Sequence, residues 1–185
     1  DRCAMAGMTY VDCPVSGGRA GAVAATVALM WAGPADLLEA HRSALSAIAR
    51  NVFQVGDRPG QGQAMKLLNN FLSATATAAT GEAMLFGLSQ GLDLETMLAV
   101  VNVSTGESYA SREKFTRRVL TGTFDSGFAT ALMAKDVALY AESAAAAGTP
   151  ADQAALTADL WRRADAALPG SDHVEMFKYQ RDGEG

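Results

Sequence analysis

The segment from Gln63 to about Gln90 constrains the fold of this 185-residue chain more than any other, because it predicts one long, uninterrupted helix. The stretch 74–81 in its middle has small side chains on every face. Since small side chains let neighbouring helices approach closely, we expect this helix at the centre of a helical bundle. Gly60 and Gly62 just before it favour a loop that leads into the helix.

The segments before the long helix predict mixed α/β structure. Short apolar runs bounded by turn residues predict strands over 9–15, 26–31 and 52–55. A helical pattern over 36–49 separates the second strand from the third. This is too little to make a complete doubly wound sheet.

The segments after the long helix are all helical in pattern. Asp93 is placed as an N-cap, with Thr96 at the third helical position. The predicted helices cover 93–103, 107–120, 130–147, 149–168 and 173–180. We therefore predict a mainly α chain in two parts. Residues 1–59 are α/β in pattern, and residues 60–185 are all helical and open with the long helix at about 63–90.

Composition excludes several classes of partner. The net charge of −5 gives no support for binding to nucleic acid or to an anionic membrane surface. Cys3 and Cys13 do not make a disulfide framework, and no cysteine–histidine cluster has metal-ligand spacing, so we expect reduced thiols and no metal. No apolar run is long enough to span a bilayer, and no basic-then-apolar leader is present. We expect a soluble, cytoplasmic protein.

Lys66 is the strongest candidate for a chemical role. It lies in the predicted long helix among apolar neighbours, and Asn70 follows four residues later on the same helical face. Apolar surroundings disfavour the charged form of a lysine and lower its pKa towards values useful for proton transfer. The alternative is a lysine that extends its ammonium to solvent. From the helix alone, the two interpretations are equally supported.

Other candidates are weaker when each is taken alone. Backbone N–H groups at Ser16-Gly17-Gly18 can bind a carboxylate or phosphate, but a tight turn is the favoured interpretation. A solvated surface pair is favoured for Lys135-Asp136, and a core position for Phe128. The basic residues of the 107–120 helix are interpreted as a solvated face: Arg112, Lys114, Arg117 and Arg118.

Taken together and in order, three segments resemble the β-hydroxyacid dehydrogenase family, which includes 3-hydroxyisobutyrate, tartronate semialdehyde and 6-phosphogluconate enzymes. The segments are Asp12–Gly18, Gly60–Asn70, and Phe128 with Leu132 and Lys135-Asp136-Val137. The resemblance covers nearly the whole chain. It implies that residues 1–59 are the last strands and helix of an α/β, Rossmann-type nucleotide-binding domain. It also implies that residues 60–185 are an all-helical substrate and oligomerisation domain that opens with a long interdomain helix at about 63–90.

This resemblance implies a function. The family interconverts a small 3-hydroxy acid, such as 3-hydroxyisobutyrate, and its semialdehyde with NAD or NADP and without a metal. A homodimer or homotetramer built through the helical domain is also implied. The implied roles are general acid/base for Lys66, substrate binding for Ser16, Gly17, Gly18 and Asn70, and cofactor binding for Lys135 and Phe128.

The chain also departs from the family pattern. It lacks the family's Gly-x-Gly-x-x-Gly turn for the cofactor pyrophosphate, so we expect it to be a fragment that does not turn over alone. Cys13 stands where alanine is common, and Ala25 and Ala32 stand where glycine is usual. The alternative is a non-catalytic binding or oligomerisation module with the same fold. Retention of Lys66 and Asn70 together with the Ser-Gly-Gly loop favours the enzyme.

Overall fold

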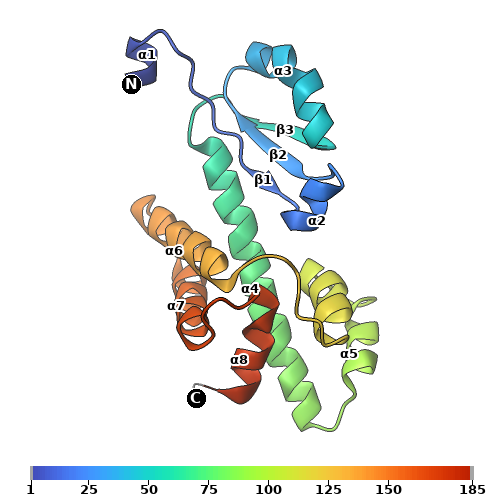
Figure 1. Cartoon of the computed structure of the whole chain (residues 1–185). Helices are drawn as coiled ribbons and strands as arrows, with labels where there is room; N and C mark the ends of the chain where they lie inside the picture. The colour runs from blue at the N-terminus through green and yellow to red at the C-terminus, as the bar shows by residue number, and fades with distance from the viewer. Residues whose placement is uncertain (1, 184–185) are drawn as a thin grey trace. The chain divides into compact units, whose positions relative to one another are not determined.

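The computed structural model describes residues 2–183 and contains two compact units, one up to Asn69 and one from Asn70 onward (Figure 1). The long helix α4 (Gln61–Ser89) contributes its first turns to the first unit and the remainder to the second. It confirms the uninterrupted helix predicted from the sequence. The chain is mainly α, as predicted.

The first unit is a three-stranded sheet with a crossover helix. Strands β2 (Ala28–Ala32) and β3 (Asn51–Gly56) pair in parallel, and α3 (Ala35–Ile48) connects them, so the predicted strand–helix–strand unit is confirmed. β1 (Val15–Ser16) pairs antiparallel with the other edge of β2. The core of this unit is apolar and consists of Val27, Leu29, Trp31, Leu38 and Ala49.

One prediction in the first unit was wrong in extent, and two short helices were not predicted. The strand predicted over 9–15 shrinks to β1 and a single bridge between Asp12 and Ala32, because Pro14 has no N–H to donate to a ladder. The short helix α2 (Gly18–Val23), which lies before β2, was not predicted. A short helix α1 (Arg2–Met5) was not predicted.

The second unit is all helical. After α4 come α5 (Leu94–Val101), the π-helix η1 (Ala110–Val119), α6 (Thr130–Ala146), α7 (Asp152–Ala167), the 3-10 helix η2 (His173–Glu175) and α8 (Met176–Asp182). The Asp93 carboxylate accepts the backbone N–H of Thr96 at 2.8 Å, which confirms the predicted N-cap of α5.

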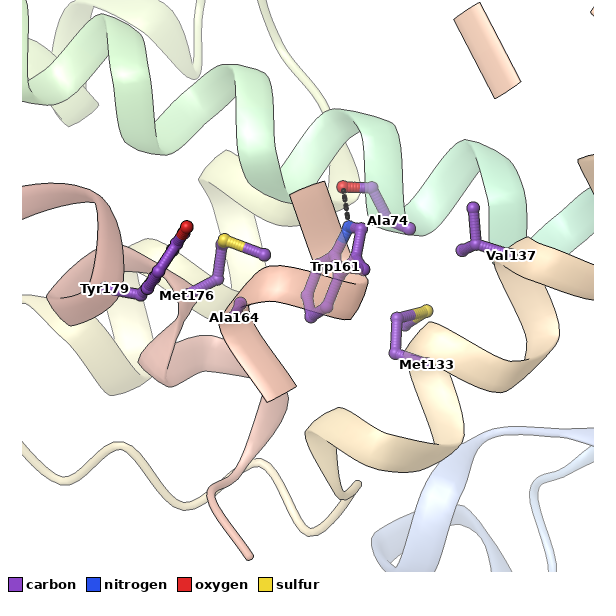
Figure 2. Close-up of a cluster of buried hydrophobic side chains, with 7 residues drawn as sticks. All are labelled: Ala74, Met133, Val137, Trp161, Ala164, Met176 and Tyr179. Carbon is purple, nitrogen blue, oxygen red and sulfur yellow. Dashed lines mark hydrogen bonds between the residues drawn. The ribbon is translucent and has the colours of Figure 1, made fainter. Parts of the chain in front are cut away.

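Small residues of α4 lie in the centre of this unit, as predicted. Ala74 is fully buried in a cluster with Trp161, and the indole Nε1 of Trp161 donates to the Ala74 carbonyl at 3.3 Å (Figure 2). Met84, further along α4, belongs to a second apolar cluster that also contains Phe115 and Phe177. Helix α4 therefore contributes to both cores of the unit.

The helix predicted over 107–120 forms, but as a π-helix rather than an α-helix. At its end the backbone N–H of Leu120 donates to the Phe115 carbonyl, five residues earlier, at 2.8 Å. The wider turn brings residues four and five apart onto the buried face, so Lys114 is buried there beside Phe115. The predicted solvated face was therefore wrong at Lys114. It is confirmed at the exposed side chains of Arg112, Arg117 and Arg118.

Candidate active site

Two of the sequence motifs meet at the start of α4. The buried Asp12 carboxylate accepts the backbone N–H groups of Gly60 and Gln63, each at 2.8 Å, and so caps the helix from outside it. Gly62 allows this approach, because a Cβ atom there would lie 2.7 Å from Asp12 Oδ2 and 2.8 Å from the Met30 carbonyl oxygen. The Asp-Cys-Pro and Gly-x-Gly segments therefore form one junction.

The Ser-Gly-Gly loop follows β1 and uses backbone conformations that favour glycine. Gly17 has φ 140° and Gly18 has φ 61°. A Cβ atom at Gly17 would also lie 3.1 Å from Cγ1 of Val27. The loop thus needs its glycines for its own shape.

Helix α4 contacts this loop through Asn69, a residue to which the sequence assigned no role. The side-chain amide of Asn69 donates from Nδ2 to Ser16 Oγ at 3.3 Å. Lys66 precedes Asn69 by three residues on the same helix and is half-buried. The sequence signal that could have identified Asn69 is its position three residues after Lys66.

Asn70, in the second unit, is buried and bound to a carboxylate. Its Nδ2 donates to Asp136 Oδ2 at 2.6 Å, and the other oxygen of Asp136 lies 3.1 Å from Lys135 Nζ. Asp136 is 8% exposed, whereas the Lys135 side chain is 60% exposed. The favoured interpretation of Lys135-Asp136 as a solvated pair was wrong for the carboxylate, because α6 turns Asp136 inwards.

Lys135 lines an open groove on the second unit. The groove lies between α6 and α7, has a volume of about 530 Å³, and is also lined by Arg162, Asp159 and Asp165. Phe128 does not line it. Phe128 packs against the core cluster around Trp161, with its ring edge-on to the imidazole of His173.

Asp172 and His173 join the loop before α6 to the chain after α7. Burial opposes ionisation of Asp172, but hydrogen bonds with His173 and Ser126 and with the backbone N–H of Gly127 hold its pKa well below the usual range. Burial lowers the pKa of His173, and its Nδ1 lies 2.8 Å from Ser126 Oγ. These hydrogen bonds join two segments of the second unit around the buried His173.

Lys114 is a second buried polar centre that the sequence analysis missed. Its ammonium donates to Ser73 Oγ and Thr77 Oγ1 of α4, both at 2.8 Å. Burial lowers the pKa of Lys114 to about 7, against the opposing charge of Asp172. Nothing in the local sequence marks it, since the burial depends on the π-helical turn.

Within residues 2–183, no three side chains of histidine, cysteine, aspartate or glutamate are grouped so that they could hold a metal ion. No helix in the same range is both long and apolar enough to cross a membrane.

Comparison with known proteins identifies the family. Residues 60–180 match the family described as NAD-binding of NADP-dependent 3-hydroxyisobutyrate dehydrogenase, and residues 1–56 match the NAD binding domain of 6-phosphogluconate dehydrogenase. This chain belongs to the β-hydroxyacid dehydrogenase family. The resemblance inferred from the three motifs is thereby confirmed.

Individual members of this family match most of the chain. 2-(Hydroxymethyl)glutarate dehydrogenase of Eubacterium barkeri is 36% identical over 84% of this chain and 51% of its own length. 3-Hydroxyisobutyrate dehydrogenase of Pseudomonas aeruginosa is 32% identical over 98% of this chain and 63% of its own. The solved structure of Mycobacterium tuberculosis 3-hydroxyisobutyrate dehydrogenase with L-serine superimposes with a TM-score of 0.88 at 31% identity, covering 97% of this chain and 64% of that one. The chain therefore spans about half to two thirds of the length of these relatives.

Proposed function

We propose that the whole protein carrying this chain interconverts a small 3-hydroxy acid and its semialdehyde with NAD or NADP, and that Lys66 is the general acid/base. The observation that carries the proposal is the bond between Asn69 and Ser16. It ties the Ser-Gly-Gly loop to the turn of α4 that follows Lys66, within one compact unit. A carboxylate-binding loop beside a half-buried lysine is the arrangement that oxidation of a hydroxy acid needs.

Each residue of the site is given a role that its chemistry suits. The Ser16 hydroxyl and the backbone N–H groups of Gly17 and Gly18 bind the substrate carboxylate. Lys66 removes the proton from the substrate hydroxyl during oxidation and returns it during reduction. When bound, the nicotinamide cofactor supplies the chemistry of hydride transfer. Asn70 orients the substrate.

Two residues of the second unit are proposed to hold the cofactor. The exposed ammonium of Lys135 suits the negatively charged phosphates of a dinucleotide, and it lies on an open groove with Arg162. Phe128 is proposed as an apolar contact. The glycine-rich pyrophosphate turn of the family is not found in this sequence, so we propose that the chain alone does not turn over. Isothermal titration calorimetry tests this, and micromolar binding of NAD or NADP to the isolated chain would contradict it.

The substrate class is proposed from the relatives. 3-Hydroxyisobutyrate, 2-(hydroxymethyl)glutarate and L-serine, which appear in the names of the relatives, all carry a hydroxymethyl group on the carbon next to a carboxylate. A loop that binds the carboxylate and a lysine that handles the hydroxyl proton would recognise this shared portion.

The domain division and the partners are also proposed. We place the end of the α/β portion at residue 59 and the helical domain at 60–185. Helix α4 and the turn after it leave large apolar side chains exposed in the second unit, and we propose that they pack in a homodimer or homotetramer: Leu72, Phe86, Leu88 and Leu92. A cytoplasmic location is proposed with this activity.

A substrate panel tests the proposed activity. The whole protein is assayed for reduction of NAD and of NADP with 3-hydroxyisobutyrate, L-serine and 2-(hydroxymethyl)glutarate, with the 2-hydroxy acid lactate as control. We expect turnover of at least one 3-hydroxy acid and none of lactate. Absence of cofactor reduction with every 3-hydroxy acid would contradict the dehydrogenase and favour a non-catalytic module.

A further inference from the structure

Asp136 is a buried carboxylate whose two oxygens contact two different residues of the proposed site. Oδ2 accepts the side-chain N–H of Asn70 at 2.6 Å, and Oδ1 lies 3.1 Å from Lys135 Nζ. Asn70 and Asp136 come from different helices, α4 and α6, and both are at least nine-tenths buried. Asp136 therefore links a proposed substrate residue to a proposed cofactor residue within the second unit.

The chemistry of this contact fixes the orientation of the Asn70 amide. An ionised carboxylate only accepts hydrogen bonds, so the amide must turn its NH₂ group, and not its oxygen, towards Asp136. Rotation of the amide by half a turn would set two oxygens against each other in a buried place, at a cost of several kcal/mol, on the order of that for a buried unpaired group. The bond thus determines where the second N–H and the carbonyl oxygen of Asn70 lie.

Burial of a carboxylate for packing alone is unfavourable. Removing an ionised group from water costs several kcal/mol, which only good partners offset. Here one partner is a neutral amide, and the other is a cation that is itself largely in solvent. An apolar residue at position 136 would hold α6 against α4 without that cost.

We propose that Asp136 is a positioning residue that acts through Asn70: it sets the orientation in which the Asn70 amide meets the substrate. The proposal rests on the proposed function, in which Asn70 orients the substrate. Asp136 itself does not touch the substrate. Its effect is on kcat, because misalignment of a bound substrate slows the chemical step.

A double-mutant cycle in the whole protein tests this. Asp136→Asn keeps the shape but lets either side of the residue-136 amide face Asn70, so the constraint is lost. We expect kcat to fall about tenfold or more with little change in KM, since small misplacements cost up to about a hundredfold. In the Asn70→Ala background the same substitution should lower kcat by less than about twofold. Additive losses would overturn the positioning role.

A side-chain swap separates positioning from simple packing. The double variant Asn70→Asp, Asp136→Asn restores an amide–carboxylate hydrogen bond in the opposite direction. We expect it to recover the unfolding midpoint of the wild type while kcat stays low. Recovery of both would show that only the link between the helices matters and would overturn the proposal. If Asp136→Asn alone does not fold, the double variant still tests the proposal.

The experiments distinguish failure of the positioning role from failure of the proposed function. Wild-type protein that oxidises none of the 3-hydroxy acids would overturn the proposed function and the positioning role with it. Active wild-type protein with an additive cycle would overturn the positioning role alone. Asp152→Asn, in the exposed first turn of α7, is the control and should leave kcat unchanged.

Discussion

Buried charged side chains contact α4 in a different way in each of the two units. In the first unit the contact is made to the helix backbone, where Asp12 accepts the N–H groups of Gly60 and Gln63. In the second unit the contacts are made between side chains, by Lys114 and Asp136. Backbone capping leaves the side chains of the first turns available for other contacts, whereas the second unit uses its buried side chains to hold helices together.

Lys114 in the second unit and Lys66 in the first illustrate the consequence of this difference. Lys114 is almost fully buried, and its partners are two hydroxyls of α4. Lys66 is only half-buried, but it precedes by three residues the asparagine that contacts the Ser-Gly-Gly loop. Burial among apolar residues alone would select Lys114. The neighbouring groups favour Lys66 as the proposed proton donor, and for Lys114 we propose a structural role.

The largest expected effect is on turnover and separates the two lysines directly. Lys66→Ala in the whole protein should lower kcat by about two orders of magnitude or more, since it removes the proposed proton donor. Lys114→Met should leave kcat within a few fold of the wild type. Steady-state kinetics at saturating cofactor measure both.

The opposite result would exchange the roles of the two lysines. If Lys66→Ala kept kcat within a few fold while Lys114→Met lost it, the proton donor would be in the second unit. Circular dichroism of both variants establishes that the fold is retained.

The next effect is a pH dependence of stability that comes from Lys114. Its pKa is about 7 in the folded protein and about 10.4 in an unfolded chain. Between these values the unfolded state binds more protons, so stability rises with pH. The slope of about 1.4 kcal/mol per pH unit gives a rise on the order of 3 kcal/mol from pH 7 to pH 10.

Urea unfolding at a series of pH values measures this rise. Lys114→Met should flatten the dependence, because methionine fills a similar volume and does not titrate. Lys178→Met is the control: Lys178, also in the second unit, is partly exposed and paired with Glu175. An unchanged slope in Lys114→Met would show that Lys114 stays charged in the fold.

The sequence predicted well what depends on local pattern. The long helix, the strand–helix–strand unit and the cap at Asp93 follow from periodicity, breakers and capping chemistry, and the structure confirms them. The resemblance added the family, which the comparisons confirm.

The sequence failed where the environment comes from distant residues. The π-helical turn buries Lys114 inside a run of basic residues, and the pairing of α6 with α4 buries Asp136. Asn69 was missed because only the folded loop brings Ser16 to it. These contacts join residues more than 40 positions apart, which no local pattern records.

A third prediction compares a buried helix cap with an exposed one. Asp12→Ala should destabilise the first unit by about 2 kcal/mol, because two backbone N–H groups lose a buried acceptor. Asp93→Ala removes an exposed cap and should cost about 1 kcal/mol or less. Equal losses in urea unfolding would show that burial of the cap at Asp12 adds nothing.

The smallest effect concerns the backbone of the first unit. Ala25 has φ 52°, in the left-handed region that favours glycine. Relief of the left-handed conformation of an L-residue stabilises the fold by about 1–2 kcal/mol. The greater flexibility of glycine in the unfolded chain reduces this gain by about 0.5–1 kcal/mol. Ala25→Gly should therefore stabilise the protein by about 0.5–1 kcal/mol.

Its neighbour provides the matched control. Ala24 has φ −86°, an ordinary helical value, so Ala24→Gly gains nothing from relief of strain and should destabilise by about 0.5–1 kcal/mol. Thermal unfolding of the two variants should shift the midpoint in opposite directions. Lower midpoints for both would mean that Ala25 carries no strain in the fold. Opposite shifts would show that the first unit stores local strain in its backbone at Ala25.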